Sequence, residues 1–311
     1  MNKLDEKDII GIFSSKLGIS SLDDVATIGK GIVFKTDMLV ASTDVPPGFE
    51  PWQVSRKSMV SCVSDLVSKG VKPYAAMVSL GLPENCTRSY IKGLAKGFAT
   101  ASKEFGVKIV GGDTNEAREI IIDCSMIGFT NCKLPARNGA RPGDVVVVSG
   151  MFGLPPAGLA ILMQNATSSK AFRKQAVGSV LEPMPRLRFG IALAKYFSSS
   201  IDSSDGLAIS LYELAIQSCV DIIIDNIPLS TGVDHFAKEN NLNIDELIFH
   251  GGEEYEIVAT IPRAKIGQAQ LAAKRSGVTL HIIGRTQKGK SCVIVNSKRL
   301  ENRGYVHFRK R

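Results

Sequence analysis

The chain has 311 residues, of which 44% are hydrophobic and 22% are charged, a composition that is typical of a folded protein and excludes a disordered chain. Lys and Arg number 38 against 30 for Asp and Glu, which leaves a formal net charge of +8. The length predicts two domains, and the positive charge leaves nucleic acid, a membrane surface and anionic small molecules open as partners.

The first half of the chain alternates between helical and extended patterns. The patterns predict an amphipathic helix at 5–17, a strand at 32–43, a helix at 51–69, a strand at 74–82, a helix at 87–106, a strand at 107–112 and, after a polar loop, a strand at 119–129. Pro51 at a first turn, Gly70 after a last turn and Thr87 as a cap set the helix ends. Residues 131–143 are rich in Pro, Gly and basic residues, which predicts one domain at 1–135 and a second at 136–311.

The second half continues the alternation. It predicts strands at 145–150, 220–227, 256–262, 280–284 and 292–296, with helices around 158–163, 186–198, 206–218 and 263–275 and a further helix after the strand at 220–227. Strands that alternate with helices over this length predict two α/β domains.

Residues 284–291, GRTQKGKS, match the phosphate-loop pattern GxxxxGK[ST]. That loop binds phosphate only where a helix leaves it, because the helix N-terminus supplies aligned amides. Here the exit, CVIVN, has the composition of a strand. A hairpin between 280–284 and 292–296 explains the same glycines, so we reject a phosphate loop.

The six cysteines show neither the spacing of a zinc site nor that of a disulfide framework, which favours a reducing cytoplasm. The first residues, MNKLDEKDIIGIF, carry acids where a secretory signal needs basic residues. Apolar runs stay well short of the roughly 18 residues that a membrane span needs. We therefore expect a cytoplasmic protein without membrane contact.

Aspartates at the edges of the expected strands and helices are the candidate functional residues. They are Asp23, Asp24, Asp37, Asp65, Asp113, Asp202 and Asp205. Most of them fit a helix cap or a turn when taken singly. Asp65 does not, because it lies inside a helical pattern beside an apolar stripe, where a buried carboxylate needs a partner. Several carboxylates with Gly-Gly loops suit Mg²⁺ that carries the phosphates of a nucleotide.

Seven segments carry a family resemblance: DDVA, KTDMLV, SDLVSKGVKP, GGDT, ARNGARPGD, IDSSDGLAISL and GGEEYEIVAT. In these segments the chain resembles the thiamine-monophosphate kinases, within the aminoimidazole ribonucleotide synthetase-like ATP-binding family. The resemblance implies an α/β (α+β) fold of two domains, in which the N-terminal domain pairs with its copy in a homodimer and forms a shared β-barrel-like core. It also implies ATP as co-substrate, thiamine monophosphate as acceptor, several Mg²⁺ ions, and K⁺ as a further candidate ion.

The resemblance assigns roles to individual residues. It implies metal ligands at Asp24, Thr36, Asp37, Asp65, Asp113, Asp202 and Asp205. It implies nucleotide contacts at Gly112, Asp113, Arg137 and Ser204, with Asp113 and Arg137 as catalytic residues. On the acceptor side it implies Glu253, while Asp44 and Asn302 stand where the family often has a His and an aromatic residue. Lys35 stands where the family often has Ser.

The implied reaction is in-line transfer of a phosphoryl group from ATP to thiamine monophosphate, giving thiamine diphosphate. The acceptor phosphate, with a second pKa of about 6, is largely ionised at neutral pH, so no general base is needed. Aminoimidazole ribonucleotide synthetase is the nearest alternative enzyme. The hydrogenase-maturation factor needs a reactive C-terminal Cys, and selenophosphate synthetase needs a reactive Cys or selenocysteine near the start; neither is present. A nucleotide-binding member without catalysis is disfavoured because every expected acid is intact.

A basic nucleic-acid-binding protein is the alternative from another class. Aromatic content of 6% with one Trp offers few stacking platforms, and no recognised nucleic-acid motif appears. The excess charge is local: residues 285–311 hold nine Lys and Arg and one acid, 9 − 1 = +8, so the remaining chain is neutral. We therefore expect ATP and thiamine monophosphate as partners, and no nucleic acid.

Overall fold

The computed structural model describes residues 4–19, 23–29 and 31–308. Its first half contains a five-stranded sheet with the order β1-β2-β5-β3-β4. The strands are β1 (Ala26–Ile28), β2 (Ile32–Val40), β3 (Pro73–Leu82), β4 (Lys108–Glu116) and β5 (Ile121–Phe129). β3 and β4 run parallel, whereas the other neighbouring strands of this sheet are antiparallel.

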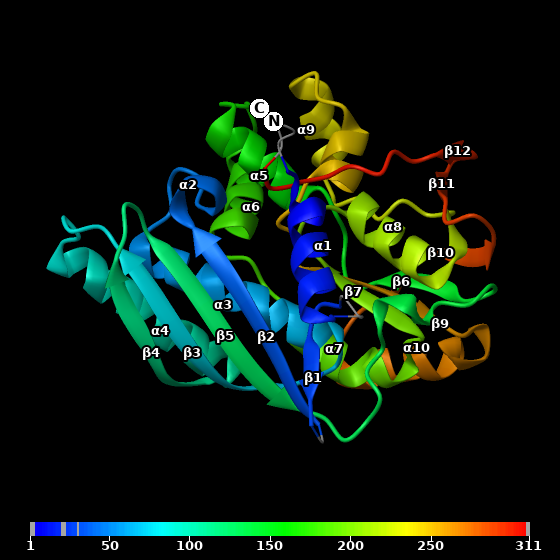
Figure 1. Cartoon of the computed structure of the whole chain (residues 1–311). Coiled ribbons are helices and arrows are strands. Elements are labelled where there is room, and N and C mark those ends of the chain that lie inside the picture. Colours follow the sequence, from blue (N-terminus) through cyan, green and yellow to red (C-terminus); the bar gives the residue numbers. More distant parts are fainter. Residues whose placement is uncertain (1–3, 20–22, 30, 309–311) are drawn as a thin grey trace.

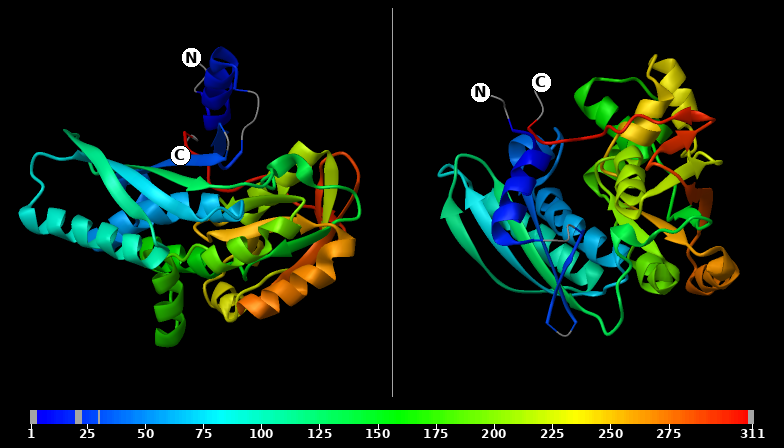
Figure 2. Two further views of the ribbon diagram at one scale, coloured as in Figure 1. Left: turned by 90° about the horizontal axis from the view of Figure 1, so that it is seen from below. Right: turned by 45° about the vertical axis from the view of Figure 1, so that its right-hand side comes forward.

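The helices of this half are α1 (Glu6–Leu17), α2 (Ala41–Asp44), α3 (Pro51–Ser68) and α4 (Arg88–Phe105). α3 and α4 lie along one face of the first sheet and leave its other face open (Figures 1 and 2). Their ends follow the expected signals: Pro51 begins α3, and the Thr87 side chain accepts a hydrogen bond from the Tyr90 amide. Gly106, in the left-handed conformation, ends α4.

The second half contains a seven-stranded sheet with the order β12-β11-β8-β10-β6-β9-β7. Its strands are β6 (Val145–Val148), β7 (Ser199–Ser203), β8 (Val220–Ile224), β9 (Glu256–Ile261), β10 (His281–Lys288), β11 (Val293–Val295) and β12 (Lys298–Arg299). Its helices are α5 (Leu154–Met163), α6 (Lys170–Leu181), α7 (Leu187–Leu193), α8 (Leu207–Ser218), α9 (Val233–Glu239) and α10 (Ile266–Ser276). Short 3₁₀ turns lie at Arg137–Gly139, Ala194–Tyr196 and Arg263–Lys265, and a π-helical turn lies at Glu246–His250.

The expected hairpin at 280–296 is wrong. Instead, β8 lies between β10 and β11. It pairs antiparallel with β10 and parallel with β11. Gly284, the first glycine of the phosphate-loop pattern, lies inside β10, and the pattern runs on toward the strand β11. No helix leaves this segment, which agrees with the rejection of a phosphate loop.

Other boundaries also differ from the sequence patterns. β4 continues beyond Gly112 to Glu116, so DTNE (113–116) is strand and not the expected polar loop. The strand expected at 32–43 ends at Val40, and residues 41–44 form α2. The patterns also missed α6 and the serine-rich strand β7.

The change from one sheet to the other falls between β5 and β6, where the sequence predicts a domain boundary. One cluster of buried side chains nevertheless spans both sheets: Val63 and Leu66 of α3 pack in it with Ile257 and Ile261 of β9. The division at residue 135 therefore stays a prediction. Within the described part of the chain, no helix has the length and apolar character needed to cross a bilayer.

Candidate active site

Three carboxylates meet where the two halves of the chain touch. Asp24 lies just before β1, Asp65 in the last turn of α3, and Asp202 in β7. All three residues are buried, and one carboxylate oxygen from each lies within 4.8 Å of the other two. The structure thus brings together three acids that are up to 178 residues apart in the sequence (202 − 24). This group is called the acid cluster below.

The buried Lys69 and the half-buried Arg137 occupy both oxygens of Asp24. Lys69 Nζ lies 2.8 Å from Oδ2, and Arg137 Nε donates to Oδ1 at 2.9 Å. Burial by itself disfavours the charged form of Asp24, but the Lys69 and Arg137 charges together outweigh it and lower the pKa. Asp24 is therefore ionised and tightly held. Arg137, expected on a phosphate, here contacts an acid of the cluster.

The other two acids have raised pKa values. Burial raises the pKa of Asp65 well above its usual range, opposed by Lys35 and reinforced by Asp202 and Asp24. Burial and the charge of Asp24 also raise the pKa of Asp202. Ser64 Oγ donates to Asp202 Oδ2 at 3.0 Å. Carboxylates crowded in this way are stabilised by a bound cation, which relieves both the burial penalty and the repulsion.

Two loops of the second half form the adjoining wall. The Glu253 amide donates to the Ser204 carbonyl at 2.6 Å, and the Tyr255 amide donates to the Ser203 carbonyl at 2.8 Å. Glu253 and Tyr255 both have left-handed backbones, with φ of 72° and 51°. Residues other than glycine rarely adopt that conformation, and it persists only where the surrounding structure holds it. The segments IDSSDGL and GGEEYE, chosen from the sequence, therefore form one structural unit.

Asp205 lies at the mouth of the acid cluster, and its side chain reaches solvent. The protein around it removes part of its hydration, and Asp202 adds repulsion, so that the pKa of Asp205 rises to about 7. The Tyr305 amide donates to the Asp205 carbonyl at 3.0 Å, which holds the C-terminal segment beside this loop.

Lys57 connects the acceptor-side residues. Its buried ammonium lies 2.8 Å from Glu253 Oε2 and donates to the Asp44 carbonyl at 2.5 Å. The Asp44 side chain accepts from the Val40 amide at 2.7 Å, so this carboxylate closes the turn of α2. Glu253 and the Asp44 backbone thus share one cation. Asn302 is exposed in the segment after β12, and its expected contact with the acceptor stays a prediction.

β2 divides the expected metal ligands between two faces of the first sheet. Lys35 and Asp37 point toward α3: Lys35 Nζ lies 2.6 Å from Asp65 and 3.9 Å from Asp37. Thr36 points to the open face, where its hydroxyl donates to Asp123 Oδ1 at 2.9 Å. Burial and the repulsion of other carboxylates raise the pKa of Asp37 against the opposing charge of Lys35. Asp37 therefore belongs to the surroundings of the acid cluster, and Thr36 does not.

Asp113 also lies on the open face. It is opposite Ser79 in β3, which is opposite Asp123 in β5, so these three residues form a row across the sheet. Asp113 is exposed, and β5 and β3 separate its strand from β2. Strands are spaced by about 4.8 Å, which puts Asp113 about 14 Å from β2 in the same chain. The structure does not bring Asp113 to the acid cluster.

Gly112 has a structural reason to be glycine. A Cβ atom at this position would lie 1.8 Å from the Val78 carbonyl oxygen of the neighbouring strand. Any side chain here would force β3 and β4 apart. Close strand packing thus explains this glycine, and its nucleotide contact stays a prediction.

The sequence patterns missed four charged residues of the site: Lys35, Lys57 and Lys69 as partners of the acids, and Asp123 on the open face. Lys57 and Lys69 lie within or directly after a helix of which almost every residue is buried. A lysine on such a helix is a usable signal, because buried lysine requires an anionic partner. Asp123 alternates with apolar residues in β5, which predicts that it faces away from them.

The donor set fits a hard cation. The acid cluster with Asp37 and Asp205 offers carboxylate oxygens, the ligands that Mg²⁺ prefers. When all are ionised, these five aspartates and Asp23, which also contacts Lys69, carry −6, and Lys35, Lys69 and Arg137 return +3, which leaves −3 for bound cations. The acids present therefore suit Mg²⁺.

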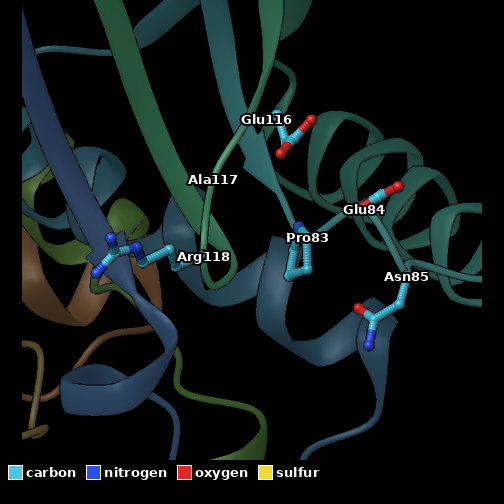
Figure 3. Close-up of a pocket in the computed structure, with 6 residues that line it drawn as sticks. All are labelled: Pro83, Glu84, Asn85, Glu116, Ala117 and Arg118. Atoms are coloured by element: carbon cyan, nitrogen blue, oxygen red, sulfur yellow. The ribbon is translucent and has the colours of Figure 1, made fainter.

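A separate pocket lies beyond the ends of β3 and β4 (Figure 3). It is lined by Pro83, Glu84, Asn85, Glu116, Ala117 and Arg118. The expected site residues are not among them. This open pocket of mixed charge is distinct from the acid cluster.

Comparison with known proteins identifies the family. Residues 22–130 match the family model of AIR synthase related protein, N-terminal domain. The chain is 40% identical to a thiamine-monophosphate kinase of Nitrosopumilus maritimus, over 99% of this chain and 100% of that protein. The chain belongs to the thiamine-monophosphate kinase family. It is also 36% identical to the thiamine-monophosphate kinase of Pyrococcus horikoshii, over 97% of this chain and 94% of that protein.

The fold agrees with that of this family. The solved structure of AaThiL complexed with AMPPCP and TMP superposes with a TM-score of 0.89 at 29% identity, over 99% of this chain and 98% of that one. The α/β fold expected from the sequence is thus confirmed. The β-barrel-like core shared between two copies stays a prediction, because the first sheet is open in the single chain.

Proposed function

We propose that this chain transfers the γ-phosphoryl group of ATP to the phosphate of thiamine monophosphate, which gives thiamine diphosphate and ADP. The observation that carries the proposal is the acid cluster of Asp24, Asp65 and Asp202, placed between the two halves of a chain whose relatives across nearly its whole length are thiamine-monophosphate kinases. A related structure complexed with AMPPCP and TMP supports the choice of both substrates.

In the proposed reaction an oxygen of the acceptor phosphate forms a bond to the γ-phosphorus of ATP. The bond between that phosphorus and the oxygen bridging to the β-phosphate breaks, and ADP leaves with the electron pair. The acceptor oxygen is already ionised at neutral pH, so a general base has no proton to remove. The chain's task is to align two polyanions and to balance their charge.

The residues of the acid cluster would hold Mg²⁺, which when bound neutralises phosphate charge and orients the phosphoryl group. Lys69 and Arg137 hold Asp24 ionised and fixed, and Ser64 orients Asp202. Arg137 retains partial exposure of its side chain beside Asp24, which leaves room for a phosphate contact from its outer edge.

On the acceptor side, Lys57 fixes the Glu253 carboxylate at 2.8 Å and the end of α2 at 2.5 Å. We propose that Glu253 contacts the positively charged part of thiamine. Lys57 fixes the orientation of the Glu253 carboxylate, which remains an anion. Asp44 and Asn302 flank this side as proposed substrate contacts. Ser204 and Gly112 complete the proposed nucleotide contacts.

We also propose that two copies pair through the open face of the first sheet. Several large apolar side chains there are more than half exposed: Met38, Tyr74, Met77, Val110 and Phe129. The rings of Tyr74 and Phe129 make an edge-on contact with centroids 5.2 Å apart. An apolar patch of this kind is typical of a protein interface. Light scattering of the purified chain should give twice the mass of one chain.

All six cysteines are free thiols, which agrees with the proposed location in a reducing cytoplasm.

The test of the activity is incubation with ATP, Mg²⁺ and thiamine monophosphate, followed by chromatography of the thiamine phosphates. We expect stoichiometric thiamine diphosphate and ADP from the native chain, and none from Asp65→Asn. Asp234→Asn, at an exposed position of α9, removes the same charge outside the site and should keep full activity. Repeating the assay with K⁺ replaced by Na⁺ tests the proposed monovalent ion. No thiamine diphosphate at any Mg²⁺ or K⁺ concentration would contradict the proposal.

A further inference from the structure

Lys35 places a positive charge inside the acid site. It lies in β2, and its ammonium is 2.6 Å from Asp65 Oδ2 and 3.9 Å from Asp37 Oδ2. The Lys35 side chain is only 22% exposed, so these contacts are shielded from water. An ammonium is a compact point charge with three donors and no acceptor, which lets it bridge two carboxylates as a small cation does.

We infer that the Lys35 ammonium takes the place of one divalent cation between Asp37 and Asp65. The charges around Lys35 support this assignment. Lys69 and Arg137 already occupy both oxygens of Asp24, and Asp202 accepts a hydrogen bond from the neutral Ser64. With Lys35 counted, these five aspartates and Asp23 keep −3 when all are ionised, which bound divalent ions balance in addition to those that arrive with ATP.

Without Lys35 the same acids would keep −4, and a further cation would be needed between Asp37 and Asp65. That position has oxygen donors from two carboxylates, one of them in the acid cluster. Mg²⁺ prefers oxygen donors, so the two carboxylates that Lys35 bridges have the donor atoms of an Mg²⁺ site.

The surroundings hold Lys35 in this position. Lys35 lies opposite Met126 of the neighbouring strand β5, and β1 pairs with the residues of β2 just before it, so the backbone at Lys35 is held within the sheet. Moving the ammonium away would leave the buried Asp65 without its nearest cation. An unpaired buried charge strongly destabilises a folded protein. Lys35 is therefore a permanent counter-ion of the acids and not a side chain that swings to the nucleotide.

The inference rests on the proposed function for the role of the metal, and its test is a metal count that does not depend on turnover. Mn²⁺, an oxygen-binding divalent probe, is titrated into the native chain with AMPPCP, and free Mn²⁺ is measured by electron paramagnetic resonance. Lys35→Ser removes the ammonium, and Lys35→Arg retains the charge. Lys72→Ser, at an exposed position, is the matched control for net charge.

We expect Lys35→Ser to bind one more Mn²⁺ per chain than the native protein, while Lys35→Arg and Lys72→Ser bind the native number. Circular dichroism establishes that each variant is folded, and Lys35→Asn is measured in parallel as a second variant without the charge. The rise in melting temperature between EDTA and saturating Mg²⁺ should also be larger for Lys35→Ser than for the native chain, because an additional site couples metal to folding.

An unchanged or lower Mn²⁺ count in both Lys35→Ser and Lys35→Asn would overturn the inference. Failure of the proposed function looks different: the native chain would bind Mn²⁺ as expected and form no thiamine diphosphate. A native chain that binds no Mn²⁺ at all would overturn the metal role of the acid cluster and, with it, that of Lys35.

Discussion

The buried ammonium of Lys69 lies 2.8 Å from Asp24 Oδ2 and donates to the Ser200 carbonyl at 2.6 Å. It also lies 2.7 Å from Asp23 Oδ1. One side chain therefore joins the end of α3, the segment before β1 and the strand β7. Because β7 belongs to the second sheet, Lys69 links the two halves of the chain at the acid cluster.

Replacing Lys69 with Met should strongly destabilise the fold. The substitution keeps the volume but leaves Asp24 with Arg137 as its cation and Asp23 without its closest one. Breaking a buried ion pair in this way costs about 3–5 kcal/mol. Urea unfolding measures the loss. Lys72→Met, at an exposed position three residues away, should change stability by less than about 0.5 kcal/mol; an equal loss in both variants would contradict the proposed role of Lys69.

Replacing Lys57 with Met should weaken acceptor binding in particular. Lys57 holds Glu253 in place, and a hydrogen bond to a charged group is worth about 1.5–3 kcal/mol, or tenfold and more in affinity. We expect KM for thiamine monophosphate to rise by about tenfold or more while KM for ATP changes little. Steady-state kinetics with each substrate varied separately measure both. Lys103→Met, exposed on α4, serves as the control, and an equal rise in both KM values would show a general disturbance instead.

The stability of the metal-free protein should fall as pH rises through the range in which Asp205 ionises. Burial and Asp202 raise the pKa of Asp205 from 3.8 to about 7, so the folded chain holds this proton more tightly than the unfolded chain does. Stability from Asp205 is therefore present at low pH and is lost between about pH 4 and about pH 7. In EDTA, Asp205→Asn should gain stability over the native chain at about pH 8 and not at about pH 4.

Mg²⁺ should oppose this trend, because a metal binds the ionised carboxylate. Urea unfolding of both proteins with and without Mg²⁺ measures the effect. A gain from Asp205→Asn that is the same at both pH values would show that the carboxyl group does not titrate as proposed.

Two inactive variants should restore activity to each other if Asp113 acts across a dimer. In one chain Asp113 lies on the opposite face of the first sheet from Asp65, so it reaches an acid cluster only in a second copy. Asp65→Asn and Asp113→Asn should each be nearly inactive. When they are unfolded together, mixed and refolded, heterodimers contain one intact site, which predicts about a quarter of the native activity.

The outcome distinguishes the two arrangements. If Asp113 serves the acid cluster of its own chain, each chain of a heterodimer carries a defect in its own site, and the mixture stays inactive. If Asp113→Asn alone keeps turnover within a few-fold of the native chain, Asp113 is not a metal ligand in either arrangement.

Local signals were sufficient for much of the fold. Pro51, Thr87 and Gly106 mark helix ends that the structure confirms, since caps act over one helical turn. Asp65 could be predicted from the sequence because Asp has a low helix propensity and is unusual inside a helix beside an apolar stripe. The sequence does not reveal which of the expected ligands lie together. The structure shows that Asp24, Asp65 and Asp202 meet at one point.

The elements and residues that the sequence patterns did not predict depend on long-range pairing or have an ambiguous composition. The serines of β7 have little strand preference, and the strand forms because β9 pairs with it. The insertion of β8 between β10 and β11 depends on contacts between residues sixty or more positions apart, which a hairpin pattern cannot reveal. Lys35, Lys57 and Lys69 were overlooked because a lysine is normally solvated, and only the folded chain shows which carboxylates surround it.

α3 is almost completely buried, so it holds the residues at its two ends at a fixed distance from each other. Lys57 contacts the acceptor side and Lys69, at the helix end, contacts the acid cluster. Twelve residues at a helical rise of about 1.5 Å separate them by about 18 Å. A one-residue insertion between them would turn one end by about 100° relative to the other and separate the two ends of the site. Changes in chain length among related proteins should therefore be found in surface segments such as 164–169, and not in this helix.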